Sequence, residues 1–87
     1  MAAIADDHKI FRKGVILSLR TFTNIKFVLE AENGDDLLNN IVQAEPEVIL
    51  MDLRMPGIGG LEAARRIRIA LPRVRIIGAS DYDLFGE

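Results

Sequence analysis

The stretch VILMDLRMPGIGG, residues Val48–Gly60, joins a short apolar run to a turn through a single acid, Asp52. Four apolar residues precede Asp52, and a short run without polar alternation is typical of a strand that is buried on both faces. Pro56 and Gly57 follow soon after. Proline fixes φ and lacks an amide donor, and glycine favours turns, so neither a strand nor a helix is expected to continue there. The stretch therefore predicts a buried strand that ends at a carboxylate and leads into a stiff turn.

Outward from this stretch, strand-like and helix-like patterns alternate along the chain. Short apolar runs predict strands at residues 2–5, 25–31, 47–52 and 74–80, and apolar residues at helical spacing predict helices at residues 8–21, 35–45 and 60–71. This alternation is typical of βαβ units with right-handed crossovers, which form a parallel sheet with helices on both faces. The expected fold class is α/β. If the order of the strands reverses after the second strand, so that the first strand lies beside the third, the strand order is 2-1-3-4.

The same periodicity predicts which helical side chains face the core. In the first helix we expect Phe11, Leu19 and Phe22 to be buried. In the third helix the inward stripe is expected to include Leu61 and Ile67.

Composition limits the classes of protein to consider. The chain has 87 residues, 49% of them hydrophobic and 28% charged, which is typical of one small globular domain. The net charge of −2 gives no general attraction to nucleic acid, so direct nucleic-acid contact is not expected. Without cysteine there are no disulfides or thiolate metal sites. No apolar run has the length of a membrane span, and Asp6 and Asp7 come too early for a signal peptide, so we expect no membrane contact and a cytoplasmic location.

Three acids are expected to meet at one edge of the sheet. Asp6 and Asp7 follow the first strand, and Asp52 ends the third. If these strands are neighbours, about 4.8 Å apart, their carboxylates share one crevice. Two charges about 4 Å apart repel by about 4 kcal/mol at an effective dielectric constant of about 20. The acids must therefore either take up protons or bind a cation, and oxygen-only ligands favour Mg²⁺.

Simpler roles exist for each of these residues. Asp6 and Asp7 are also suited to capping the first helix, and Asp52 to ending a strand. His8, the only histidine, is expected to face solvent at the start of the helix rather than to bind a ligand. The three acids together, however, favour a metal-supported phosphate site.

Asp52 is the best candidate for a nucleophile in such a site. It stands at the end of a rigid buried strand, and carboxylates attack phosphorus to form an aspartyl phosphate. Ser80 ends the neighbouring strand and is expected to offer a hydroxyl group to a phosphoryl oxygen.

The segments ADDH, VILMDLRMPG, GLEAARRIR and RIIGAS resemble the receiver domain of two-component response regulators. They resemble most the regulators that carry a helix-turn-helix DNA-binding output domain. The resemblance implies a flavodoxin-like fold in which Asp52 accepts a phosphoryl group from a histidine kinase. It further implies that Asp7 and Asp52 bind Mg²⁺ directly, that Asp6 acts mostly through water, that the main-chain carbonyl of Arg54 is a further ligand, and that Ser80 is the hydroxyl residue. Such a domain is a phosphoacceptor with at most self-catalysed phosphorylation and dephosphorylation.

The chain also departs from the family pattern. Receiver domains of this kind continue through a fourth helix, a fifth strand that carries a lysine, and a fifth helix. Here no lysine follows Lys26, and the sequence reaches only the fourth strand. We therefore interpret residues 1–87 as a truncated receiver domain and expect impaired phosphorylation.

Two other functions fit parts of the pattern. The fourth strand is expected to form an exposed sheet edge with Val74, Ile76 and Ile77, and such edges pair with other chains. The alternative function is thus a structural or self-assembling fragment of a receiver fold, as a homodimer through this edge or by domain swapping, without signalling activity. A phosphatase that resembles the haloacid dehalogenases is disfavoured, because these enzymes need an acid where Arg54 stands.

Overall fold

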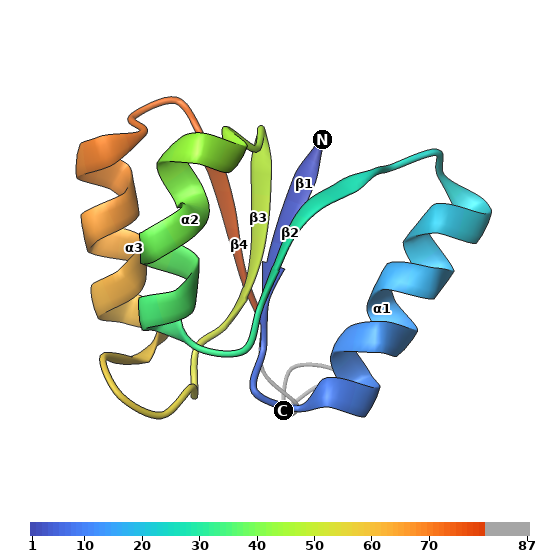
Figure 1. Cartoon of the computed structure of the whole chain (residues 1–87), viewed down its shortest axis with the longest axis horizontal. Coiled ribbons are helices and arrows are strands. Elements are labelled where there is room, and N and C mark those ends of the chain that lie inside the picture. Colours follow the sequence, from blue (N-terminus) through green and yellow to red (C-terminus); the bar gives the residue numbers. More distant parts are fainter. Residues whose placement is uncertain (80–87) are drawn as a thin grey trace.

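In the computed structural model, which describes residues 1–79, the chain folds into a four-stranded parallel sheet with helices on both faces (Figure 1). The strand order is β2-β1-β3-β4, so the predicted α/β fold and strand order are confirmed. The elements are, in sequence order, β1 (Ala2–Ala5), α1 (Lys9–Phe22), β2 (Phe27–Ala31), α2 (Gly34–Ala44), β3 (Val48–Asp52), α3 (Gly59–Ala70) and β4 (Arg75–Ala79).

The two faces of the sheet are covered differently. Helix α1 lies on one face, and α2 and α3 lie together on the other (Figure 1). The main core fills the space between the sheet and the α2–α3 pair. Its largest fully buried side chains are Leu37, Ile41, Ile49, Met51 and Ile67. Because apolar surface leaves water mainly on this side, the α2–α3 face supplies most of the hydrophobic stabilisation among the described residues.

The central pair of strands sets the position of the acids. Strand β1 lies between β2 and β3, and its four residues are all buried. In the pairing of β1 with β3, Ala5 lies opposite Met51. The next residue on each strand, Asp6 and Asp52, therefore emerges at the same edge of the sheet.

Two of the predicted core residues are on the surface. Phe22 is 83% exposed at the last position of α1, and Leu61 is 76% exposed near the start of α3. In α3 the buried stripe consists of Gly60, Ala63 and Ile67. The small residues of this stripe let the helix approach the sheet closely. The helix is therefore rotated about its axis so that this stripe faces inward and Leu61 faces outward.

Phe11 and Leu19 are only half-buried, in contrast to the full burial predicted for them. Within residues 1–79, no helix combines the length and apolar character needed to cross a membrane.

Candidate metal centre

Four titratable side chains meet where β1 and β3 end. Asp6, Asp7, His8 and Asp52 each offer one ligand atom, and these atoms all lie within 4.8 Å of one another. Asp6 and Asp52 are 4% and 6% exposed, whereas Asp7 and His8 lie on the surface. The predicted convergence of the three acids is thus observed, and it follows directly from the neighbouring positions of β1 and β3.

Each of the two buried acids is held by a turn of its own, and the two turns are of the same kind. One carboxylate oxygen of Asp6, Oδ1, accepts a hydrogen bond of 2.7 Å from the backbone N–H of His8. The Oδ1 atom of Asp52 accepts a bond of 2.9 Å from the backbone N–H of Arg54. An Asp side chain that binds the amide two residues ahead forms a compact turn. Each turn therefore fixes its carboxylate at the end of its strand.

The segment after β3 is shaped by glycines. Gly57 and Gly59 have φ angles of +83° and +73°, a region that side chains other than glycine's rarely adopt. Gly60 packs against the backbone of the turn, because a Cβ atom there would lie 2.6 Å from Leu53 Cα and 2.7 Å from the carbonyl oxygen of Asp52. These glycines allow α3 to begin directly beside Asp52.

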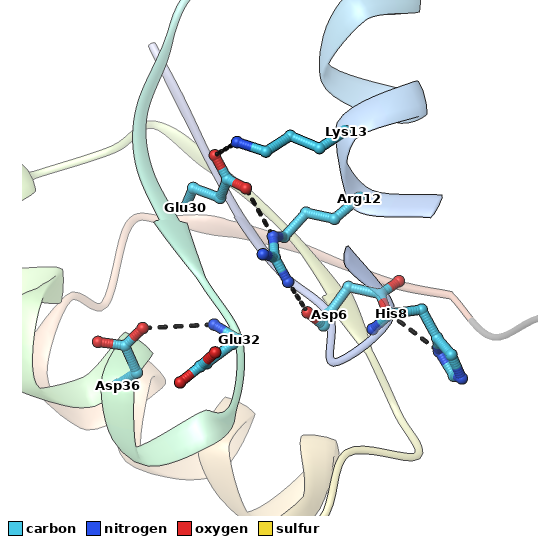
Figure 2. Close-up of polar contacts among 7 residues, drawn as sticks. All are labelled: Asp6, His8, Arg12, Lys13, Glu30, Glu32 and Asp36. Atoms are coloured by element: carbon cyan, nitrogen blue, oxygen red, sulfur yellow. Dashed lines mark hydrogen bonds and ion pairs between the residues drawn. The ribbon is translucent and has the colours of Figure 1, made fainter. Parts of the chain in front are cut away.

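A buried arginine connects the β1–α1 link to β2 (Figure 2). Arg12 Nε donates to Glu30 Oε1 at 2.7 Å, and Arg12 Nη1 donates to the main-chain oxygen of Asp6 at 2.6 Å. Lys13 Nζ donates to the other oxygen of Glu30 at 2.9 Å. The hydrogen bond from Arg12, and then that from Lys13, hold the pKa of the Glu30 carboxyl below its ordinary value. Glu30 is therefore the anionic partner of Arg12 at neutral pH.

His8 faces solvent as predicted, with 57% of its side chain exposed, yet it also lies beside the acids. Its Nδ1 is 3.2 Å from Asp7 Oδ1 and 3.4 Å from Asp6 Oδ1. The only signal in the sequence was its position directly after Asp7. When protonated, His8 supplies a positive charge next to the acids, and when neutral its imidazole favours transition metals more than Mg²⁺.

The remaining predicted residues stand as follows. Arg54 lies in the turn after β3, where its amide binds Asp52, and its role as a carbonyl ligand stays a prediction. Ser80 lies outside the described residues 1–79, and its role also stays a prediction.

The donor set suits a hard divalent cation. Three carboxylates converge on one point, and carboxylate oxygen is the donor that Mg²⁺ prefers. Their mutual repulsion is relieved when a cation lies among them. Asp6, Asp7 and Asp52 therefore fit the ion that the sequence predicts.

A family model described as the response regulator receiver domain matches residues 2–84 of the chain. The chain belongs to this family. Its match spans both halves of the acid cluster and the helices and strands between them, so the fold and the family agree.

Curated and solved relatives of this receiver domain are response regulators. The response regulator GacA of Pseudomonas viridiflava is 34% identical over 77 residues, which cover 88% of this chain and 36% of GacA. The response regulator UvrY of Escherichia coli is 42% identical over 74 residues, which cover 85% of this chain and 34% of UvrY.

Among solved structures, the isolated REC domain of RcsB from Salmonella enterica serovar Typhimurium, in the presence of the phosphomimetic BeF3-, superposes with a TM-score of 0.81 at 32% identity. The match covers 88% of this chain and 58% of that domain. The chain thus spans little more than a third of the length of the curated relatives it matches.

Proposed function

We propose that this receiver domain accepts a phosphoryl group from a histidine kinase on Asp52, in a reaction supported by Mg²⁺. The observation that carries the proposal is the convergence of the Asp6, Asp7 and Asp52 carboxylates within 4.8 Å. Burial of Asp52 and the amide of Arg54 on its Oδ1 atom hold the nucleophile still. Further support comes from RcsB, whose REC domain was solved in the presence of a phosphomimetic.

Each residue of the site has a distinct role in this proposal. Asp7 and Asp52 bind the ion directly, Asp6 binds mostly through water, and the carbonyl of Arg54 completes the protein ligands. Ser80 offers its hydroxyl group to a phosphoryl oxygen. Bound Mg²⁺ neutralises negative charge on the phosphoryl oxygens.

The transfer makes one bond and breaks one. A carboxylate oxygen of Asp52 attacks phosphorus and forms the new O–P bond, while the P–N bond to the kinase histidine breaks. The electron pair of that bond stays on the imidazole nitrogen, which takes up a proton. The protein contributes mainly by holding Asp52 in position and by excluding competing orientations.

Mg²⁺ binding and phosphoryl transfer are expected to be affected to different extents by the lack of a lysine after Lys26. All lysines of this chain, Lys9, Lys13 and Lys26, precede α2, and Lys13 already pairs with Glu30. The family pattern places a lysine on a fifth strand, and residues 1–87 contain no lysine after Lys26, so less positive charge stabilises the phosphoryl group. We therefore expect residues 1–87 to retain Mg²⁺ binding but to accept a phosphoryl group poorly.

Calorimetric titration with Mg²⁺ tests the proposal. Because Asp52→Asn removes one of the ligand charges, it is expected to weaken Mg²⁺ binding by about tenfold or more. Incubation with acetyl phosphate and Mg²⁺ is expected to add a phosphoryl group to the wild type, detected as intact mass, and none to Asp52→Asn.

A matched control is Glu45→Gln, which removes an equal charge at the opposite end of β3 from the acids. This control is expected to bind Mg²⁺ as the wild type does. Equal Mg²⁺ affinities of the wild type and Asp52→Asn would contradict the proposal.

In a longer protein that contained this domain, we infer a cytoplasmic regulator of transcription whose helix-turn-helix output domain contacts DNA. The curated relatives that support this are between two and three times as long as the matched segment, and one of them is the transcriptional activator protein ExaE of Pseudomonas putida. The receiver domain itself is proposed to make no direct nucleic-acid contact.

A second candidate function is self-association through β4. Within residues 1–79 this strand pairs only with β3, which leaves its other edge open. Of the three apolar residues predicted there, Val74 is buried, Ile76 packs against the core, and Ile77 is 53% exposed. An open edge with an exposed apolar residue favours pairing with a second copy, and we propose a homodimer by this route.

A further inference from the structure

The most deeply buried side chain of helix α1 is charged. Among its residues, all of which the structure describes, Arg12 alone is buried, and its apolar neighbours are half-buried or exposed. A buried arginine is unusual unless it is fully paired, since removing its charge from water is costly. The position of Arg12 therefore depends on the partners that its guanidinium group finds.

Those partners belong to the metal site and to its neighbouring strand. The guanidinium donates to the Glu30 carboxylate on β2 at 2.7 Å and to the main-chain oxygen of Asp6 at 2.6 Å (Figure 2). On the other side of the same residue, the N–H of Asp6 donates to the carbonyl of Ala31 at 3.0 Å. The backbone of Asp6 is thus held from both sides.

The oxygen that Arg12 binds belongs to the peptide that joins Asp6 to Asp7. A hydrogen bond to that oxygen fixes the plane of the peptide, and so fixes the direction in which the chain enters Asp7. The Asp7 side chain is 30% exposed, and its Oδ1 atom lies 3.2 Å from His8 Nδ1. The Arg12 guanidinium group therefore orients the peptide that leads into Asp7, while the amide of His8 holds the Asp6 carboxylate.

We propose that Arg12, braced by Glu30, is a positioning residue for Mg²⁺ binding, which it supports by holding the Asp6–Asp7 peptide in the orientation that the site needs. The inference rests on the proposed function, because it takes Asp6 and Asp7 as metal ligands. It adds a residue outside the acid cluster to the machinery of the site.

A purely electrostatic role of Arg12 and a positioning role predict opposite changes in Mg²⁺ affinity when the guanidinium group is lost. A nearby cation repels Mg²⁺, so loss of the Arg12 charge alone would tighten Mg²⁺ binding. A positioning role predicts weaker binding on loss of the guanidinium group, because residues that orient metal ligands typically contribute tenfold or more to affinity. The sign of the change therefore separates the two.

The test is calorimetric titration of the 87-residue chain with Mg²⁺, at a temperature where circular dichroism shows each variant to be folded. Arg12→Gln is expected to raise the Mg²⁺ dissociation constant by about tenfold. Arg12→Lys keeps the charge but cannot reproduce the rigid fork of donors, so its dissociation constant is expected to change in the same direction by less. Arg65→Gln on α3, which removes an equal charge at the surface, is the control and is expected to leave the affinity unchanged.

Glu30→Gln gives an independent test that does not alter Arg12 and serves if Arg12→Gln does not fold. It removes the anionic brace, and it is expected to weaken Mg²⁺ binding less than Arg12→Gln does. Unchanged or tighter Mg²⁺ binding by Arg12→Gln would overturn this inference alone. If Arg12→Gln does not fold, unchanged Mg²⁺ binding by Glu30→Gln would overturn it. A wild type that binds no Mg²⁺ would overturn the proposed function and this inference together.

Discussion

Gly60 is the residue at which α3 comes closest to the turn that carries Asp52. A Cβ atom on Gly60 would lie 2.6 Å from Leu53 Cα, far inside van der Waals contact, and the atoms it would meet belong to the backbone. A backbone cannot move aside as a flexible side chain does. Any larger residue at this position must therefore displace the helix or the turn.

Gly60→Ala is accordingly expected to destabilise the fold by about 2 kcal/mol, measured by urea unfolding, because overpacking of a closed site has costs of this size. Gly14→Ala is the matched control. Gly14 lies within α1, and apart from the adjacent residues and backbone of its own helix no atom lies within 4 Å of where its Cβ would be, so alanine there is expected to stabilise the helix by about 0.5–1 kcal/mol. Similar unfolding midpoints for the two variants would contradict the close packing of Gly60.

At this scale the sequence indicates some residues of the site and not others. The positions of Asp6, Asp7 and Asp52 follow from strand ends, which local patterns reveal. The contacts of Arg12 and Gly60 depend on how α1 and α3 pack after the chain has turned, and no local pattern reveals them. The sequence shows that His8 directly follows Asp7, but the distance from its imidazole to the acids depends on how α1 begins.

At the scale of helices and strands, β4 is the element whose surroundings matter most for association. Its pairing with β3 is complete from Val48–Arg75 to Asp52–Ala79, while its other edge has no partner within the described residues. A lysine on an edge strand opposes pairing with another strand.

Ile77→Lys is therefore expected to keep the chain monomeric in analytical ultracentrifugation, at concentrations where the wild type forms a dimer. Val42→Lys serves as the control, because Val42 is 58% exposed on α2, which packs against β2 at the opposite side of the sheet from β4. This control is expected to dimerise as the wild type does. A wild type that stays monomeric at high concentration would exclude the homodimer.

The bounds of the elements are predictable from the sequence to within about two residues, because apolar periodicity and the prolines mark them. The rotation of a helix about its axis is less predictable. In α3 the large residue Leu61 suggested one inward stripe, but Gly60 and Ala63 form the stripe that is buried. The rotation of α3 is set by how closely the helix approaches the sheet, and apolar periodicity does not predict that distance.

At the scale of the whole molecule, the order of the strands brings the acids of the site together. Asp6 and Asp52 are 46 positions apart in the sequence, yet the order β2-β1-β3-β4 makes β1 and β3 neighbours. The same order leaves α1 on one face, where it is attached through Arg12, and a packed core on the other (Figure 1). From the sequence alone this order was a condition, and the predicted convergence of the acids depended on it.

The most direct test of the shared site uses Mn²⁺ in place of Mg²⁺ and records which backbone amide signals broaden in nuclear magnetic resonance spectra. One ion held by Asp6, Asp7 and Asp52 is expected to broaden the amides of residues 6–8 and 52–54 together, at substoichiometric Mn²⁺. Asp52→Asn is expected to weaken the effect in both segments at once. Broadening confined to one segment, or spread over the acids of the whole surface, would contradict a common metal site.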